Sequence, residues 1–358
     1  MANLIGLSAA SDIANAALKF YIRKGGLSQT TQDKPLLAKL QGKQETFPGG
    51  NSVISLPVQG VYMSDTAGFL QGYSEDELIS FNQAQNLVRA EYNWYEVASG
   101  LIITWTELKK DGITVVEDSG KPMNHSRATE TRLTSLLKNR VEDFGESWSR
   151  ELNKMLWADG SADAQHVPGV LSLLTDDPNN GTTGGIARTN VWWRHRARVG
   201  ALAVTANTGP KITSSPTNQT LSKTLRAEII QLRRYGGKPD CALCGSDFLE
   251  AFRAEVTEKG YYTQNNFNQA SATQIGVASL KLDNLEFYYD PTLDDLGREK
   301  FCYIIDTRRL KLMPMEAEDN RVLNPEKPYN ALVFLQMMTW TGGLTINQLN
   351  ANGVYEVA

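Results

Sequence analysis

The clearest periodic pattern in this 358-residue chain is RATETRLTSLLKNRVEDFGESWSRELNKMLWA, residues 127–158. Its apolar residues recur at intervals of one, three or four, which places them on one face of a helix. They are Leu133, Leu136, Leu137, Val141, Phe144, Trp148, Leu152, Met155 and Leu156. Asn124 or Ser126 can cap the start, and Gly160 suits the C-terminal stop. Because a helix rises 1.5 Å per residue, we expect a spine roughly 45 to 50 Å long.

An extended region rich in tyrosine and tryptophan precedes the helix. The pattern predicts a strand over residues 51–63, a polar connection over 64–79 and a returning strand over 82–105. A long two-stranded arm is marginal in water when it is isolated. Its aromatic side chains therefore need a partner surface, and we expect a neighbouring subunit to provide it.

Both ends of the chain complete a mixed helix and strand pattern. Residues 8–24 predict a short amphipathic helix, and residues 27–50 lack periodicity and predict an extended arm. Helices are expected over 221–235 and 248–256. Strands are expected over 240–244, 280–289, 301–306, 310–315, 331–340 and 344–349. The fold class predicted is α+β, with an α/β core after the long helix.

Composition excludes several classes of protein. The net charge of −4 and the pI near 5.6 argue against tight nucleic-acid binding, so we expect only weak, non-specific contact with DNA. Three cysteines argue against a disulfide-stapled secreted domain. The first 20 residues lack the pattern of a signal peptide, and no run of about 18 apolar residues predicts a membrane span. We expect a reducing cytoplasm and no membrane partner.

Four short motifs could suggest chemistry. Cys241 and Cys244 have CxxC spacing but lack a second metal-binding pair, so buried structural cysteines are favoured. Residues 181–185 are glycine-rich and favour a loop with positive φ over a phosphate site. The aromatic and basic run at 192–198 favours a partly buried anchor over nucleic-acid stacking. The acidic residues at 176–177 and within 316–319 favour solvated loops over a cation site. We expect no cofactor, metal or catalytic residue.

The order of these segments resembles the HK97-type fold of major capsid proteins of tailed bacteriophages. Gly184-Gly185-Ile186-Ala187-Arg188, shortly before Trp192-Trp193-Arg194, is similar to a recurrent segment of one branch of those proteins. Tyr92-Asn93-Trp94 leading to Glu107-Leu108-Lys109 fits the same branch. The resemblance covers nearly the whole chain, and the ordered set of motifs carries it.

The resemblance implies a division into parts. An N-terminal arm would take residues 1–46 and an extended E-loop hairpin residues 47–106. A peripheral domain would take 107–165 with the spine helix, plus strands near 280–315. An axial α/β domain would take 166–279 and 316–358.

Charge supports contacts between subunits. Residues 1–50 carry six basic and three acidic side chains, whereas residues 51–100 carry six acidic side chains and one arginine. Complementary fields favour correct register between partners, so we expect the acidic E-loop to lie over basic positions of a neighbour. The candidate contact residues are Phe69, Leu70, Tyr73, Glu75, Asp76, Glu77, Trp94, Lys34, Lys39 and Lys43.

Two departures from known members of the fold are informative. The best-known member links an E-loop lysine covalently to a neighbour's asparagine, but this sequence has no lysine between Lys43 and Lys109. We therefore expect a shell without covalent cross-links. Only about 25 residues precede the arm, so we expect a separate scaffolding protein rather than a fused one.

The resemblance implies a non-enzymatic major capsid (head) protein of a tailed bacteriophage. It would self-assemble into hexamers and pentamers of an icosahedral shell around double-stranded DNA, in the host cytoplasm, and remain in the virion. Expected partners are copies of itself, a scaffold, a portal and a decoration protein. Two alternatives stay open. One is an encapsulin-like cellular nanocompartment shell, and the other is a cytosolic thiol- or metal-dependent enzyme using Cys241 and Cys244.

Overall fold

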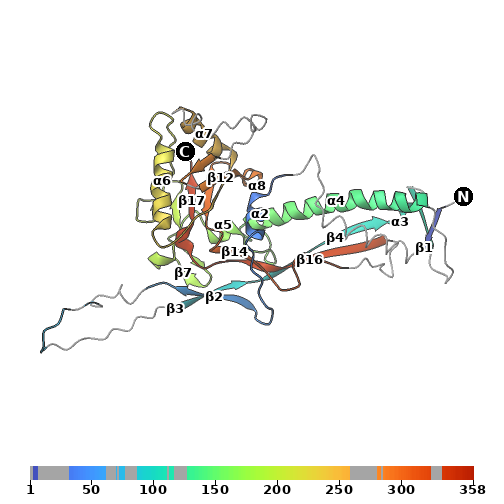
Figure 1. The fold of residues 1–358 in the computed structure, drawn as a ribbon, viewed down its shortest axis with the longest axis horizontal. Helices are drawn as coiled ribbons and strands as arrows, with labels where there is room; N and C mark the ends of the chain where they lie inside the picture. Colours follow the sequence, from blue (N-terminus) through green and yellow to red (C-terminus); the bar gives the residue numbers. More distant parts are fainter. Residues whose placement is uncertain are drawn as a thin grey trace. The chain divides into compact units, whose positions relative to one another are not determined.

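The computed structural model describes most of the chain, and Figure 1 shows its elements. The described residues are 3–6, 32–61, 70, 72–76, 87–110, 113–116, 127–258, 280–283, 285–323 and 333–358. They fall into two compact units. The first lies within Met1–Gln32, Tyr95–Lys154 and Pro314–Gly342, and the second within Asp33–Trp94, Met155–Met313 and Gly343–Ala358. The predicted helix over 8–24 lies outside the described residues.

A seven-stranded mixed sheet forms the centre of the second unit. Its strand order is β11-β12-β10-β13-β17-β8-β9. In chain order, the strands are β8 (Arg196–Arg198), β9 (Thr208–Gly209), β10 (Cys241–Cys244), β11 (Leu280–Leu282), β12 (Leu285–Tyr289), β13 (Phe301–Ile305) and β17 (Gly353–Glu356). The interior strand β10 is parallel to β12 and antiparallel to β13. All four residues of β10 are buried, as the predicted strand over 240–244 requires.

Helices α6 (Thr220–Arg233) and α7 (Ser246–Glu258) cover one face of this sheet. Leu225 and Ile229 of α6 recur four residues apart and are buried in the core that the sheet and both helices share. In α7, Phe252 stacks on Phe287 of β12 with ring centroids 4.8 Å apart. Both helices confirm the periodicity in the sequence.

The opposite side of the sheet contacts a short helix, α2 (Pro35–Gln41), and the end of α4 (Arg127–Trp157). Trp157 packs against Tyr303 of β13 at 5.1 Å and donates a 2.7 Å hydrogen bond to buried Asp290. Asp290 caps helix α8 (Pro291–Asp295) by accepting from the backbone N–H of Thr292. The α4 bounds confirm the predicted spine helix to within one residue.

Helix α2 corrects the expectation of an extended arm over residues 27–50. Proline at the first helical position fixes a helical φ, which favours a helix start there. Leu36, Leu37 and Leu40 then fall on one buried face. Two turns are too short for periodicity to reveal in a polar segment, and burial against the sheet stabilises them.

Strands β2 (Val53–Gln59) and β3 (Leu87–Asn93) form the predicted antiparallel hairpin, with Val53 opposite Asn93 and Gln59 opposite Leu87. The return strand, however, is not one run over 82–105. It stops at Trp94, and the next strand, β4 (Tyr95–Thr104), pairs with β16 (Val333–Ile346). Alternation in the sequence predicted strands correctly but could not identify the partner of the second half.

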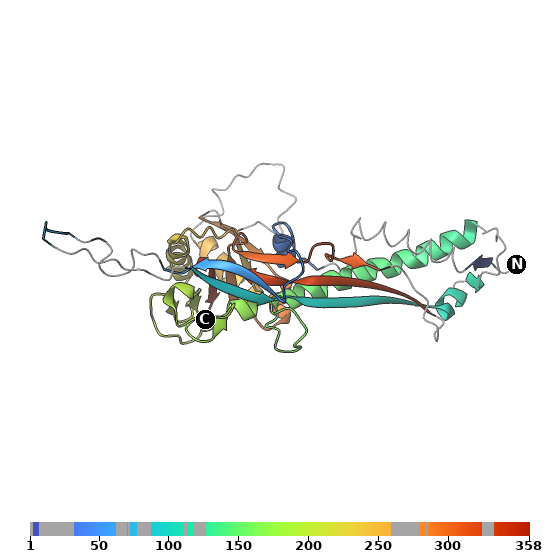
Figure 2. The same ribbon diagram turned by 90° about the horizontal axis from the view of Figure 1, so that it is seen from below.

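The first unit is built on this β4–β16 ribbon and on α4 up to Lys154. Ten consecutive pairs join β4 to β16, from Thr104 opposite Val333 to Tyr95 opposite Gly342 (Figure 2). Strand β15 (Arg321–Val322) pairs with the other edge of β16. Helix α3 (Trp105–Lys110) follows β4, and β1 (Asn3–Gly6) runs parallel to β5 (Ile113–Val116).

The remaining elements of the described residues are short. They are α5 (Val170–Leu173), β6 (Thr182–Thr183), β7 (Ile186–Ala187), the 3₁₀ turns η2 (Val191–Trp193) and η5 (Leu349–Ala351), and β14 (Leu310–Pro314).

The structure differs from the division implied by the resemblance at more than one point. Residues 316–342 were expected in the axial domain, but Pro314–Gly342 lies in the first unit with α4 up to Lys154. We expected strands near 280–315 to accompany the spine helix in a peripheral domain. Strands β11, β12 and β13 instead pair with β10 and β17, inside the sheet of the second unit. Hydrogen bonding between strands far apart in sequence decides this arrangement, and a single sequence does not record it.

Candidate assembly surfaces

The root of the β2–β3 hairpin, which is the end that includes Ile54 and Tyr92, packs against its own chain. The hairpin face that includes Ile54, Ala90 and Tyr92 is buried. The Tyr92 hydroxyl donates a 2.7 Å hydrogen bond to the Ile346 carbonyl at the end of β16, and burial raises the pKa of Tyr92 well above its ordinary value. The root is therefore a fixed base.

The segment 184–188, with the sequence GGIAR, contacts the root of the hairpin. Gly184 has φ +58°, and its carbonyl accepts a 3.0 Å hydrogen bond from the backbone N–H of Glu91. A Cβ on Gly184 would lie 2.8 Å from the Tyr92 ring, so only glycine allows this approach. The expectation of a loop with positive φ at 181–185 is confirmed, since Gly181 and Gly185 also have positive φ.

Arg188 links this segment by hydrogen bonds to residues 172–183. It is buried, and its guanidinium donates to the Thr183 hydroxyl at 2.8 Å, to the Thr175 hydroxyl, and to the carbonyls of Ser172 and Leu173 at 3.1 and 3.3 Å. Burial lowers the pKa of Arg188. A buried arginine satisfied mainly by neutral oxygen atoms is structural, and sequence reasoning did not assign it this role.

The aromatic and basic run at 192–198 is an internal anchor, as the sequence favoured. Trp193 is buried and donates to the Thr183 carbonyl at 3.0 Å. Arg194 bonds the carbonyls of Arg188 and Thr189, and Arg196 bonds Glu228. Because these guanidinium groups already have partners in the chain, the run is poorly suited to contact nucleic acid.

Beyond its root, the hairpin carries exposed apolar side chains. Leu70 is 94% exposed and Tyr73 is 70% exposed, and Leu87 and Val88 are also exposed near the far end of the strands. Glu75 and Asp76 are exposed beside them, while Phe69 and Glu77 lie outside the described residues. Large apolar groups exposed together with acids form a surface suited to a protein partner.

Trp94, another predicted contact residue, is half-buried where the hairpin ends. Its ring N–H donates to the Asn51 carbonyl at 2.9 Å. This bond ties the two chain segments that enter and leave the hairpin. Its contact with a neighbouring subunit stays a prediction.

The three predicted arm lysines lie in or beside α2. The Lys39 ammonium donates a 3.0 Å hydrogen bond to the Tyr288 hydroxyl, and this bond raises the pKa of Lys39. Lys43 pairs with Asp240 at 2.6 Å. Lys34 is half-buried at the start of α2. These bonds dock α2 on its own sheet, and contact of the lysines with a neighbour's E-loop stays a prediction.

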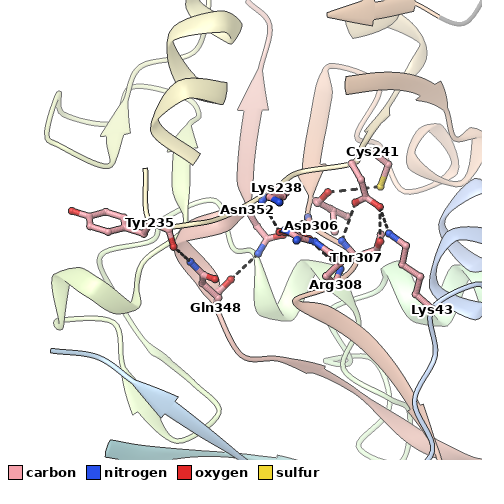
Figure 3. A network of polar contacts seen from close by, with 11 residues as sticks. Lys43, Tyr235, Lys238, Cys241, Asp306, Thr307, Arg308, Gln348 and Asn352 are labelled. Atoms are coloured by element: carbon pink, nitrogen blue, oxygen red, sulfur yellow. Dashed lines mark hydrogen bonds and ion pairs between the residues drawn. The ribbon is translucent and has the colours of Figure 1, made fainter. Parts of the chain in front are cut away.

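Figure 3 shows the network that receives Lys43. Asp240 also accepts from the Thr307 backbone N–H at 3.0 Å and from its hydroxyl at 2.6 Å. Burial alone would raise the pKa of Asp240, but the hydrogen bonds from Lys43 and Thr307 hold it below its ordinary value. Neighbouring Asp306 is buried and accepts from the backbone N–H of Lys238 and from Arg308. Every carboxylate in this network is satisfied, which indicates a structural junction.

The β4–β16 ribbon of the first unit has one buried and one exposed apolar face. Ile103, Met338 and Trp340 point to the buried face. On the other face, Ile102 lies opposite Leu335 and both are exposed, as is Met337. Alternation in the sequence predicts the two faces but not that the second would also be apolar. This face is a second candidate for burial by a neighbour.

The cysteines are structural. Cys241, Cys244 and Cys302 are free and buried, and burial raises the pKa values of Cys241 and Cys302. The Cys244 and Cys302 sulfurs lie 3.2 Å apart. Within the described ranges, no group of three metal-ligating side chains occurs and no helix is long and apolar enough to cross a membrane.

Comparison with known proteins identifies the fold. No family model and no curated protein matches the chain. Among solved structures, a subunit of the capsid asymmetric unit of cyanophage A-1(L) is similar, with a TM-score of 0.64 and 13% identity over 93% of this chain and 95% of that one. This chain has the HK97-like capsid fold.

Two further capsid structures share the fold. The capsid of Myoviridae phage XM1 gives a TM-score of 0.53 at 10% identity, and the capsid of the native GTA particle gives 0.52 at 14% identity. Each match covers 93% of this chain and 95% of the other. The HK97-like fold expected from segment order is thus confirmed, with α4 as its spine helix and β2–β3 as the root of its E-loop.

Proposed function

We propose that this chain is the major capsid protein of a tailed bacteriophage. The observation that carries the proposal is the fold match along 93% of the chain to subunits of capsids, among them a cyanophage and a Myoviridae phage. A fold shared over that length leaves no additional domain for a separate activity among the matched residues. The chain then acts by assembling, without catalysis, and remains in the virion.

The exposed surfaces support assembly. The E-loop carries Leu70 and Tyr73 in solvent, and the β4–β16 ribbon exposes Ile102, Leu335 and Met337. Burial of apolar area stabilises association by roughly 25 cal/mol per Å² before the costs of ordering. Closed shells sum many such contacts, so each contact can be weak. Copies of the chain forming hexamers and pentamers would bury these groups.

Charge supports the arrangement of the E-loop over a neighbour. Glu75 and Asp76 are exposed, and a positive patch on the neighbour would fix their register. Reversing Glu75, Asp76 and Glu77 to lysine should reduce the yield of closed particles. Normal yield from this variant would rule out the electrostatic role of the E-loop.

The shell is held without covalent cross-links in this proposal. Residues 44–108 contain no lysine, so the E-loop lacks an amine nucleophile. A denaturing gel of mature particles should show the 39.6 kDa monomer. A ladder of heavier species resistant to denaturant would contradict this.

Assembly in the cell involves other components. We propose a separate scaffolding protein, a portal and a decoration protein as partners, and weak, non-specific contact with packaged double-stranded DNA. The net charge of −4 and the internal bonds of Arg194 and Arg196 support weak DNA contact. Salt-sensitive binding of DNA at micromolar or tighter affinity would contradict that part.

Expression of the chain, alone and with a co-expressed scaffold candidate, tests the function. Sedimentation and electron microscopy should show closed shells with five- and six-fold capsomers. A chain that stays monomeric at high concentration with every scaffold tested would contradict the proposal. Shells that enclose a cellular enzyme instead of DNA would support the encapsulin-like alternative.

A further inference from the structure

Helix α6 presents two faces of opposite character. Its inner residues, among them Leu225 and Ile229, are buried in the core of the second unit. Its outer positions are exposed and carry four cations and two large apolar side chains. This α6 basic face consists of Lys223, Arg226, Ile230, Arg233, Arg234 and, directly after the helix, Tyr235.

The acid of this helix does not balance these cations. Glu228 is buried and forms ion pairs with Arg196 and, at 2.7 Å, with Arg198 of β8. Burial alone would raise the pKa of Glu228, but the two arginines hold it below its ordinary value. Among the residues that the structure describes, no ion pair involves Lys223 or Arg226. The α6 basic face is therefore positive in a chain whose net charge is −4.

Apolar side chains lie among the cations. Ile230 is 64% exposed and Tyr235 is 63% exposed. Ile230 lies four residues after Arg226 and three before Arg233, so all three share one stripe of the helix. Apolar residues surrounded by arginine are typical of protein interfaces, whereas contact with DNA phosphates needs no exposed isoleucine.

A face of complementary charge lies elsewhere on the same unit. Asp247 and Glu250 of α7, Asp295 of α8 and Glu299 are exposed and form the α7–α8 acidic face, together with the partly exposed Tyr289. Arg253, Arg298 and Lys300 are the cations near it, and Asp294 is a fifth acid, so acids outnumber cations by five to three.

Asp294 joins α7 to α8 within this face. Its carboxylate accepts from the Ser246 backbone N–H at 2.9 Å and from the Tyr289 hydroxyl at 2.7 Å. These bonds hold the start of α7 against α8 and fix the orientation of Tyr289. The acidic face is thus a built surface with an aromatic ring inside it.

The two faces lie over different parts of the sheet. Helix α6 contacts β8 through Arg196 and Arg198, whereas α7 contacts β12 through the Phe252–Phe287 stack. In the sheet, β8 and β12 lie on opposite sides of β13. In the view of Figure 1, α6 lies to the left of β17 and α8 to the right of β12, so the two helices lie toward different ends of the strand order. A copy can therefore use one face toward each of two neighbours.

We propose that the α6 basic face of one copy docks on the α7–α8 acidic face of the next copy. The occupant is a second copy of this chain, and charge complementarity between the faces supports that choice. Because the two faces differ, the contact is head-to-tail, and its repetition closes a ring when the rotation between copies divides a full turn. The inference rests on the proposed capsid function and names the charged surfaces that order subunits within a capsomer.

Charge swapping tests the contact. One variant carries Lys223→Glu and Arg226→Glu, another carries Glu250→Lys and Glu299→Lys, and a third carries all four changes. Like charges facing each other should lower the particle yield of each two-site variant about tenfold or more, whereas the four-site variant should recover most of it. Yield is measured by sedimentation and electron microscopy under conditions where the unaltered chain forms shells.

A matched control reproduces the change in net charge of the α6 variant. Lys154→Glu with Lys211→Glu makes the same change of charge at exposed positions outside both faces and should leave the yield near that of the unaltered chain. Circular dichroism checks that each variant folds. If the α6 glutamate variant does not fold, Lys223→Gln with Arg226→Gln replaces it and should still reduce the yield.

Three outcomes overturn the contact. The two-site variants assemble normally, or the folded four-site variant is not rescued, or the α6 variant forms normal shells that retain less DNA, which would make the α6 basic face a nucleic-acid surface. Failure of the unaltered chain to form shells would contradict the proposed function itself. The two failures are therefore distinguishable.

Discussion

The Tyr92 hydroxyl donates a 2.7 Å hydrogen bond to the Ile346 carbonyl, joining the E-loop root to the end of β16, 254 residues away in sequence. The bond is buried. The E-loop is therefore anchored at its base on its own chain, while its distal apolar residues remain exposed.

Removing the Tyr92 hydroxyl should weaken that anchor. Tyr92→Phe leaves a buried carbonyl without its donor, which should cost about 1 to 2 kcal/mol of unfolding free energy. Tyr73→Phe is the control, because Tyr73 is exposed and should change stability by less than about 0.5 kcal/mol. Denaturant unfolding of the unassembled chain measures both. Equal stability of Tyr92→Phe and the unaltered chain would mean that the bond contributes nothing.

Gly184 and Gly185 offer a matched pair. Gly184→Ala combines a positive φ with a Cβ 2.8 Å from the Tyr92 ring, and should cost about 2 to 4 kcal/mol. Gly185→Ala has a positive φ but no heavy atom within 4 Å of the Cβ, and should cost only about 1 kcal/mol. Chemical denaturation compares them. Equal losses would show that the approach of the hairpin to Gly184 is not tight.

His195 should make stability sensitive to acid. It is buried, its Nε2 lies 2.7 Å from the Thr175 carbonyl, and burial lowers the pKa of His195 from 6.5 to about 4. Arg188, which lowers this pKa further, and Asp177, which raises it, are the charged groups that act on the ring. The unfolded chain binds the proton more readily, so stability should fall as the pH drops from about 6.5 to about 4.

The His195 contribution is measurable as a slope. The loss over that interval should be on the order of 3 kcal/mol. His195→Gln removes the titrating group and should flatten the dependence of unfolding free energy on pH, whereas His166→Gln, at an exposed site, should not. If the His195→Gln slope matches that of the unaltered chain, another group is responsible for the acid sensitivity.

Glu228 should matter far more than a surface acid in an ion pair. Glu228→Gln leaves the partly buried Arg196 and Arg198 without their carboxylate and should cost about 3 kcal/mol or more. Glu318→Gln breaks an exposed pair with Arg321 and should cost below about 1 kcal/mol. Thermal and denaturant unfolding distinguish the two, and similar losses would contradict the structural role of the buried cluster.

Local sequence patterns predicted most of the secondary structure. Apolar spacing placed α4, α6 and α7 closely, and β10 followed from a short buried run. The pairing of strands that are far apart in sequence could be identified only from the structure. The partner of β4 is β16, more than 200 residues later, and β-strand alternation does not encode a partner.

The candidate surfaces were only partly predictable. The acids and aromatic residues of the E-loop follow from composition. The hydrogen bonds of Tyr92 and Arg188 depend on carbonyl groups of other segments, which composition does not indicate. Lys43 illustrates the same limit, since sequence gives its charge but not its pairing with Asp240. Such contacts are products of the fold.

Reconstruction of an assembled particle by cryo-electron microscopy tests the central claim most directly. We expect a shell in which the E-loop segment with Leu70 and Tyr73 lies against a neighbouring subunit and both side chains are buried there. A chain that gives no particles, or particles in which each E-loop contacts only its own subunit, would contradict the account.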